Sequence, residues 1–135
     1  MANAPDHLTK ADFAALSELR YQMRRFERFS EGAARSEGIT PLQYLMLLHI
    51  KGYAGRDWAT VGELAERLQA QQHGVVALVT RCEQAGLVER RPSTDDRRRV
   101  EVHLLPAGEA ILRKLAAVHR AELRAQRGFT VPNLS

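Results

Sequence analysis

The 135-residue sequence contains little of what defines several large protein classes. Its single cysteine, Cys82, excludes an intrachain disulfide. The longest apolar runs, at 45–48 and 75–79, fall far short of the roughly 20 residues that a transmembrane helix needs. The first ten residues have no apolar core of the kind found in a signal peptide. These absences predict a reduced, cytoplasmic protein with no membrane partner.

Motifs for catalysis, cofactors and metals are missing as well. The sequence has no Gly-rich phosphate loop and no nucleophile motif built around Ser or Cys. His119 and Glu122 have a spacing that can bind metal, but no Cys or second close His accompanies them. We therefore expect no enzyme, no cofactor and no metal site. Cys82 falls on the inward face of a predicted helix, which favours a core thiol over an oxidant sensor.

The composition is that of one globular domain covering residues 1–135. Hydrophobic residues make up 44% of the chain and charged residues 27%, both ordinary values for a globular protein. Lys and Arg number 20 against 16 Asp and Glu, a net charge of +4. This modest excess is compatible with a nucleic-acid partner without requiring one.

Helical periodicity dominates the first half of the chain. Apolar residues recur at spacings of three and four through residues 9–35, which predicts a long amphipathic helix with Thr9 as its N-cap. Gly32 and Gly38 mark its expected end. A second helix begins at Pro41, where Thr40 and Gln43 have the spacing of a capping box.

Two short helices follow, separated by a polar break at 69–71. Thr60 and Glu63 form another predicted capping box at the start of the first. The second spans about 72–85, and Gly86 is placed to end it in a left-handed conformation. A short helix, a polar turn and a second helix in this order are typical of a helix-turn-helix.

The period then changes to two, which predicts a β-hairpin. Strands are expected at 87–91 and 98–104 around a turn at 92–96, with Val100, Val102 and Leu104 on one buried face. A very short strand is expected at 58–59, and a fifth helix begins at Pro106. The fold class is therefore mainly α with a small β-hairpin (α+β).

The second helix of the helix-turn-helix is the expected reading element. Its N-terminal half enters the major groove in such motifs, where Gln pairs with adenine, Arg with guanine, and small apolar groups touch a thymine methyl. The outward residues are Gln72, His73, Val76, Ala77, Thr80 and Arg81. The alternative is that they are the solvated face of an ordinary helix.

The hairpin favours the DNA-binding interpretation because it is rich in arginine. The cluster consists of Arg90, Arg91, Arg97, Arg98 and Arg99. The negative potential of a narrow minor groove attracts arginine. Asp95 and Asp96 are expected to orient a guanidinium, since DNA would repel a carboxylate. The alternative is a solvated, salt-bridged turn.

The chain resembles the multiple-antibiotic-resistance regulator (MarR) family of winged-helix proteins over about residues 9–127. The similarity is carried by LAERL at 64–68, AGLVER at 85–90, DRR at 96–98 and PAG at 106–108. It implies a winged helix-turn-helix lobe at 40–105 and dimerisation helices at 9–35 and 106–135. It also implies a homodimer on a near-palindromic double-stranded DNA operator, with Arg98 of the Asp96–Arg98 wing pair entering the minor groove.

The sequence departs from the family pattern at several positions. Leu105 stands where the family usually has Ser or Thr to cap the fifth helix, and the lost cap costs roughly 1 kcal/mol. Gly74 lies in the first turns of the reading helix, where it weakens the helix by up to about 1 kcal/mol relative to Ala.

The family also implies a small-ligand or oxidant response that loosens DNA binding. Residues that could line a ligand pocket are Tyr21, Arg25, Tyr44, His49 and Trp58. Arginine beside aromatic rings would suit a carboxylated aromatic ligand, whereas the alternative is that these rings fill the core. The expected function is a homodimeric, ligand-relieved repressor, and the alternative is a winged-helix protein–protein adaptor or antirepressor that does not bind DNA.

Overall fold

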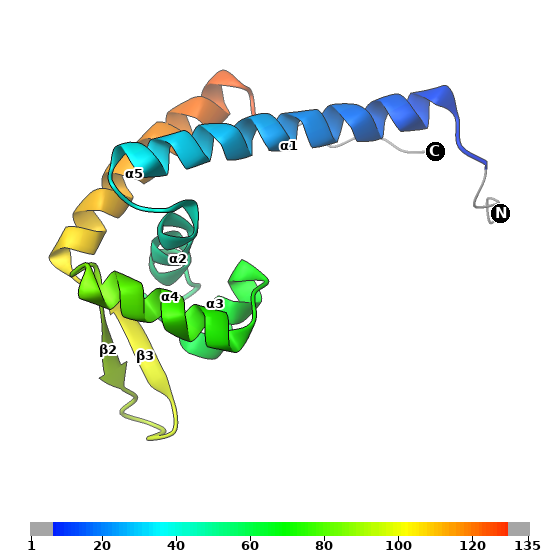
Figure 1. The fold of residues 1–135 in the computed structure, drawn as a ribbon. Helices are drawn as coiled ribbons and strands as arrows, with labels where there is room; N and C mark the ends of the chain where they lie inside the picture. Colours follow the sequence, from blue (N-terminus) through cyan, green and yellow to red (C-terminus); the bar gives the residue numbers. More distant parts are fainter. Residues whose placement is uncertain (1–6, 130–135) are drawn as a thin grey trace.

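The structure is a computed structural model that describes residues 7–129. Its elements are α1 (Lys10–Ser36), α2 (Pro41–Lys51), β1 (Trp58–Thr60), α3 (Val61–Leu68), α4 (Gln72–Gln84), β2 (Val88–Pro92), β3 (Val100–Leu104) and α5 (Pro106–Ala125). The long helices α1 and α5 form one part of the molecule (Figure 1). The helices α2, α3 and α4 form a separate lobe, from which the β2–β3 hairpin projects. The expected mainly helical winged fold is thereby confirmed.

Local sequence signals place the first three helices. Each begins with a reciprocal capping box, formed by Thr9 with Asp12, by Thr40 with Gln43, and by Thr60 with Glu63. These side chains satisfy backbone N–H groups that a helix start leaves without partners. By contrast, α4 and α5 begin without a side-chain cap, as expected for α5 because Leu105 precedes it. The last part of the predicted C-terminal dimerisation segment, residues 130–135, lies outside the described residues.

The three strands form one antiparallel sheet in the order β1-β3-β2. The first strand of the hairpin, β2, is shifted by one residue from the predicted 87–91, and β3 begins at Val100, two residues later than predicted, because the residues before it belong to the turn at the wing tip. Gly86 adopts a positive φ of 75°, as predicted. Val100 is exposed, contrary to the expected buried face, since it pairs with Pro92 at the far end of the hairpin. Only Val102 of that face is fully buried.

The hydrophobic core lies in the lobe and beneath α5. Its largest fully buried side chains are Met46, Leu47, Ile50, Leu64, Val75, Val79, Cys82, Val88, Val102 and Leu115. Ala34 is the only residue of α1 in the buried hydrophobic core. Helix α1 ends at Ser36, within one residue of the predicted bound, and Gly38, with a φ of 80°, follows it.

The N-terminal half of α1 extends away from the lobe (Figure 1). The side chain of Phe13 is 56% exposed, and Leu16 is exposed as well. The C-terminal half instead lies against α5, where the Ser30 hydroxyl hydrogen-bonds to His119 and Glu37 forms an ion pair with Lys114. The apolar stripe predicted along α1 therefore has an unpartnered first half within one chain.

The base of the hairpin is fixed to the start of α5. The carbonyl oxygen of Leu87 accepts a hydrogen bond from the backbone N–H of Leu105 at 2.9 Å. A Cβ at Gly108 would lie 2.1 Å from the same oxygen, so only glycine fits there. None of the helices within residues 7–129 has the length and apolarity that a membrane span requires.

Candidate nucleic-acid interface

Helix α4 presents the predicted reading residues on its outer face. A left-handed Gln69, with a φ of 52°, ends α3 and lets the chain turn into α4. Val75, Leu78, Val79 and Cys82 are buried, which fixes the orientation of the helix. The exposed residues are Gln72, His73, Val76, Ala77 and Arg81, while Thr80 is half-buried. Their contact with DNA stays a prediction.

Thr80 and Arg90 are brought together by the fold. The guanidinium of Arg90 donates from Nη2 to the Thr80 hydroxyl at 3.0 Å and to the Val76 carbonyl oxygen at 3.1 Å. Its Nη1 donates to Glu83 Oε1 at 2.6 Å. The backbone N–H of Arg90 donates to Glu83 Oε2 at 3.1 Å, and this bond is the main cause of the lowered pKa of Glu83. Arg90 thus lies against α4, although the sequence placed it among the wing contacts.

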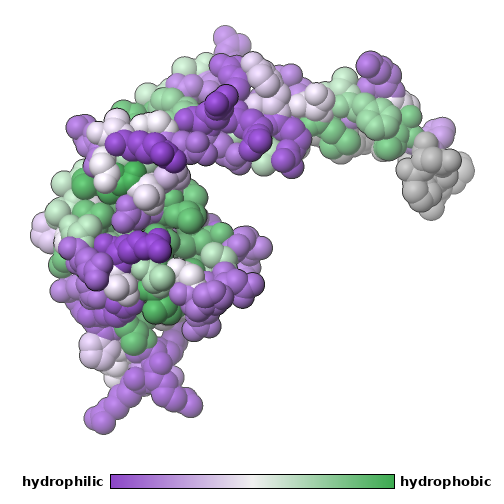
Figure 2. Space-filling model, in the orientation of Figure 1, coloured by the Kyte–Doolittle hydropathy of each residue, from purple (hydrophilic) through white to green (hydrophobic). Residues whose placement is uncertain are grey.

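The wing tip carries the exposed arginines Arg97, Arg98 and Arg99. Asp96 Oδ1 accepts hydrogen bonds from the backbone N–H of Arg98 at 3.0 Å and from its Nε at 3.3 Å. The side chain of Arg98 is nevertheless 91% exposed. Asp96 therefore orients a guanidinium that stays free to reach a ligand. Figure 2 shows the tip as a hydrophilic projection below the lobe.

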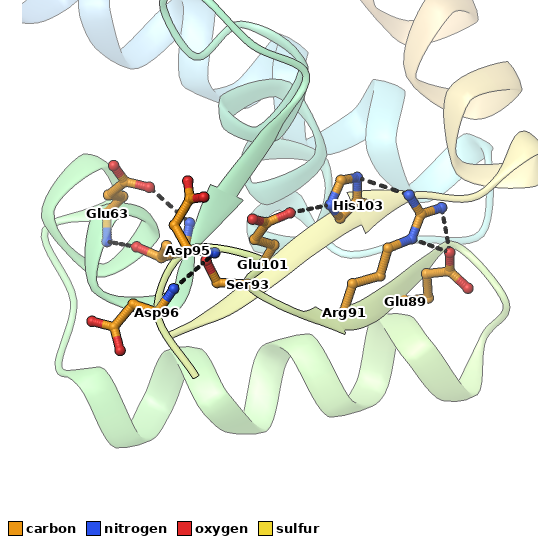
Figure 3. Close-up of polar contacts among 9 residues, drawn as sticks. Glu63, Glu89, Arg91, Ser93, Asp95, Asp96, Glu101 and His103 are labelled. Carbon is orange, nitrogen blue, oxygen red and sulfur yellow. Dashed lines mark hydrogen bonds and ion pairs between the residues drawn. The ribbon is translucent and has the colours of Figure 1, made fainter. Parts of the chain in front are cut away.

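Ser93 organises the wing turn and was not found by sequence reasoning. Its hydroxyl oxygen accepts hydrogen bonds from the backbone N–H groups of Asp95 and Asp96, at 3.2 and 3.3 Å (Figure 3). The signal was present, because a serine before two aspartates is typical of a side-chain-stabilised turn. Ser93 thereby holds Asp96 in place to meet Arg98.

Arg91 points along the sheet and belongs to a ladder of charged side chains on β2 and β3 (Figure 3). Its Nε donates to Glu89 at 2.6 Å, and its Nη1 lies 3.4 Å from His103 Nδ1. The Nε2 of His103 lies 2.8 Å from Glu101. Arg91 is thus already paired with an acidic side chain of its own strand.

Helix α4 and the wing border a shared groove. Residues from the start of α3, from α4 and from the hairpin line it, namely Thr60, Val61, Gly62, Gln72, Val76, Arg90, Arg98, Arg99 and Val100. Exposed groups of α4 and cationic groups of the wing therefore face the same space. Such a surface can place hydrogen-bond donors on base edges and guanidinium groups on phosphates together.

The residues predicted to line a ligand pocket are not gathered into one site. Tyr21 is exposed, with Arg25 5.5 Å from the centre of its ring. His49 lines a separate hollow beside Arg67, where burial and then the charge of Arg67 lower the pKa of the imidazole. Trp58 lies on the sheet, with Arg56 3.8 Å from its ring centre.

Tyr44, the last of the five, does line a cavity of about 710 Å³ between α1, α2 and α5. The other lining residues are Phe26, Ser30, Leu45, Leu48, Ala116, His119, Arg120, Leu123, Arg124, Arg127 and Gly128. His119 is the buried polar residue of this cavity, with Nδ1 2.7 Å from the Leu115 carbonyl oxygen and Nε2 2.8 Å from the Ser30 hydroxyl. In the sequence, His119 is considered only as a metal ligand and that role is rejected, although its inward position on α5 is a signal for a place in the core.

Redox and metal chemistry have little support in the part of the chain described. Within residues 7–129 no cluster of His, Cys, Asp or Glu could hold a metal ion. Cys82 is fully buried, and burial raises the pKa of its thiol to about 11. A thiol in this state is a poor nucleophile at neutral pH.

Comparison with known proteins agrees with this geometry. The model of the MarR family matches residues 37–99. A putative transcriptional regulatory protein for the hcr operon of Thauera aromatica is 30% identical over 118 residues, which cover 84% of this chain and 68% of that protein. The HTH-type transcriptional repressor MdtR of Bacillus subtilis (strain 168) is 29% identical over 63% of this chain, which spans about half of that repressor (53%).

Solved structures show the same fold. AbsC, a MarR family transcriptional regulator from Streptomyces coelicolor, superposes with a TM-score of 0.75 at 26% identity, covering 87% of this chain and 79% of AbsC. A point mutant of MepR from S. aureus, solved bound to an oligodeoxyribonucleotide, has a TM-score of 0.66 at 19% identity over 79% of this chain and 77% of MepR. The winged-helix fold, the arginine-rich wing and these relatives together identify the chain as a member of the MarR family.

Proposed function

We propose that this protein is a transcriptional repressor that binds a near-palindromic double-stranded DNA operator as a homodimer. The observation that carries the proposal is the groove bordered by Gln72 and Val76 of α4 and by Arg98 and Arg99 of the wing. In this arrangement α4 reads bases in the major groove while the wing arginines bind phosphates and the minor groove. We expect the repressor to act in the cytoplasm.

The exposed half of α1 supports the homodimer. Phe13, Leu16 and Tyr21 are exposed large hydrophobic side chains on a helix that leaves the body of its own chain. An apolar stripe of this kind is stable in water when a second copy covers it. Two copies would present two α4 helices, as a near-palindromic operator requires.

The cavity between α1, α2 and α5 supports relief of repression by a small molecule. The lining of the cavity is mainly apolar, and Arg120, Arg124 and Arg127 border it. A planar aromatic carboxylate matches this combination of apolar surface and cationic rim. The test is a titration with benzoate, followed by calorimetry and by its effect on operator affinity. Binding that is weakened by Phe26→Ala but not by Trp58→Ala would support this cavity as the site.

The DNA-binding proposal is tested by fluorescence anisotropy with pooled genomic fragments, including the promoter beside its own gene, at two salt concentrations. We expect tight binding to one near-palindromic fragment and a steep loss of affinity with salt, because phosphate contacts release counterions. Absence of binding at low salt would overturn the proposal.

Variants of the two surfaces separate their roles. Arg98→Ala is expected to weaken specific and nonspecific binding alike, because a wing arginine contacts the DNA backbone. Gln72→Ala and Arg81→Ala are expected to weaken binding mainly on the operator, because these side chains face base edges. Equal loss on both DNAs from all three variants would mean that α4 is not the reading helix.

A protein–protein adaptor is the second function considered. The modest net charge of +4 favours it, since many DNA-binding domains are more basic. An adaptor has no use for exposed arginines at the wing tip, so replacing Arg97, Arg98 and Arg99 would leave its partner binding unchanged. Loss of DNA binding in the same variants would decide for the repressor.

A further inference from the structure

Arg90 differs from the other arginines of the hairpin in what surrounds it. Arg97, Arg98 and Arg99 are exposed at the tip, whereas the side chain of Arg90 is only 28% exposed. Its guanidinium reaches three acceptors on α4: the Val76 carbonyl oxygen, the Thr80 hydroxyl and the Glu83 carboxylate. These acceptors are spaced four and three residues apart and therefore follow one side of the helix. We call this set of contacts the α4–β2 bridge.

The bridge uses most of the hydrogen-bonding capacity of its members. The Thr80 hydroxyl donates to the Val76 carbonyl at 3.1 Å while it accepts from Arg90. Glu83 accepts from both the side chain and the backbone N–H of Arg90. A planar guanidinium can make such forked contacts, and a lysine ammonium cannot reproduce their geometry. Few N–H donors of Arg90 therefore remain to bind a phosphate.

The bridge joins the two elements that border the DNA groove. Val76, Thr80 and Glu83 belong to α4, and Arg90 lies in the middle of β2, where it pairs across the ladder with Val102. Beyond Arg90 the hairpin projects from the lobe (Figure 1), and its other attachments, the pairing of β3 with β1 and the ion pair of Arg99 with Glu63, lead to β1 and α3 instead of α4. The angle between α4 and the wing therefore depends strongly on this point of attachment.

We propose, as a consequence of the proposed DNA-binding function, that Arg90 is a positioning residue: through the α4–β2 bridge it fixes the wing relative to the reading helix, so that both meet adjacent grooves of one operator. Glu83 is then equally necessary, although it carries the same sign of charge as DNA. Thr80 acts in the bridge and does not read a base.

Two changes to glutamine, each removing one charge of opposite sign, test the proposal. Glu83→Gln makes the protein more positive, and Arg90→Gln makes it less positive. If Arg90 contacts phosphate, Glu83→Gln frees it and raises DNA affinity while Arg90→Gln lowers it. If the bridge positions the wing, both variants lower operator affinity by about tenfold, the effect of losing a charge-assisted hydrogen bond.

The matched control is the neighbouring pair on the same strand. Glu89 and Arg91 pair with each other, and Arg91 reaches His103 of β3 instead of α4. Glu89→Gln and Arg91→Gln repeat the two charge changes and should shift affinity in opposite directions, as electrostatics alone requires. The double variant of Glu83 and Arg90 should be no worse than either single variant, because both belong to one interaction.

Salt dependence distinguishes the loss of a phosphate contact from the loss of a positioning contact. A lost phosphate contact reduces the slope of log affinity against log salt by about 0.9. We expect the slope to stay unchanged in Glu83→Gln and Arg90→Gln, measured well below their melting temperatures. A reduced slope for Arg90→Gln, together with tighter binding for Glu83→Gln, would overturn the proposal.

A distance measurement on the DNA-free protein separates this proposal from the proposed function. Spin labels at His73→Cys and Thr94→Cys, both exposed positions on α4 and the wing tip, report the angle between the two elements. We expect one narrow distance distribution that broadens in Glu83→Gln and Arg90→Gln and stays narrow in the control pair. An unchanged distribution would refute the bridge, whereas broadening without any DNA binding by the unmodified protein would refute only the repressor.

Discussion

The winged lobe and the first half of α1 differ in how they are stabilised. The lobe encloses side chains such as Met46, Leu64 and Val102 with no exposed surface, and its first helices begin with capping boxes. The first half of α1 has a capping box as well, yet Phe13 and Leu16 on its apolar stripe remain exposed. Local signals are thus equally good in both regions, and only packing distinguishes them.

This difference indicates that the two regions depend on different interactions for stability. A helix in water gains most of its stability from packing of its apolar face and little from propensity. The lobe supplies that packing within one chain, whereas the first half of α1 obtains it from a second chain in the proposed homodimer. Stability of the lobe and association of two chains should therefore respond to different substitutions.

The largest effect is expected from removing the apolar stripe of α1. Phe13→Ala combined with Leu16→Ala should raise the dissociation constant of the dimer by roughly a thousandfold or more, since burial of each such side chain contributes about 1.5–3 kcal/mol in each copy. Sedimentation equilibrium measures this change. Glu18→Ala, on the opposite side of the same helix, is the control and should leave the dimer intact. If the double change left the dimer unaffected, the view that α1 is stabilised by a second chain and the lobe by its own packing would be wrong.

Gly108→Ala tests the lobe without touching the stripe of α1. The added Cβ would lie 2.1 Å from the Leu87 carbonyl oxygen, and backbone must move to admit it. We expect a loss of about 3 kcal/mol in the free energy of unfolding, measured by urea denaturation. Gly62→Ala has open space around its Cβ and should change stability by less than about 1 kcal/mol. Equal effects at both glycines would contradict the close packing of α5 on the wing base.

The alkylation rate of Cys82 reports how well the lobe excludes reagents. The pKa of Cys82 is raised from 9.0 to about 11, so its thiolate fraction at pH 8 is about 100-fold lower than in the unfolded chain. Alkylation by iodoacetamide should slow by at least that factor, whereas a cysteine introduced by Glu18→Cys, on the side of α1 opposite the apolar stripe, should react rapidly. Rapid labelling of both would mean that the lobe opens readily.

The same shift predicts a loss of stability in alkali. The folded state keeps the Cys82 proton where the unfolded state has lost it, so this contribution is complete below about pH 9 and disappears as pH rises to about 11. Urea denaturation across that range measures it. Cys82→Ala, compared with its own stability at pH 7, should lack this part of the decline.

The smallest expected effect is a gain. Gly74 lies in an exposed turn of α4 with no atom within 4 Å of where its Cβ would be. Gly74→Ala should therefore raise the free energy of unfolding by up to about 1 kcal/mol. It should leave the dimer unchanged, because the reading helix belongs to the lobe. Thermal denaturation and sedimentation together test both statements.

Features that depend on neighbouring residues could be predicted from the sequence. The capping boxes at Thr40 and Thr60, the left-handed Gly86 and the Asp96–Arg98 pair each involve residues within three positions of one another. Periodicity also identified the inward face of α4, because Val75, Leu78, Val79 and Cys82 recur at helical spacing. The winged-helix order followed from these elements.

Features that depend on distant contacts could not be predicted. Arg90 was grouped with the wing arginines because nothing in the sequence indicates that β2 folds back along α4 to Thr80 and Glu83. The cavity depends on contact between Ser30 and His119, which are 89 positions apart. The sequence therefore predicts one pocket from residues that share aromatic character, whereas in the fold these residues lie at separate sites.

The strand order of the sheet has a consequence for cooperativity. β1 precedes the helix-turn-helix and β3 follows the wing tip, yet the two pair directly, with Trp58 opposite His103. The whole segment that carries α3, α4 and β2 is therefore a closed loop whose ends are joined by backbone hydrogen bonds. We expect this closure to couple the opening of α4 to the opening of its neighbours. Amides of α3, α4 and β3 should then exchange with solvent deuterium as one unit, while those at the start of α1 exchange independently.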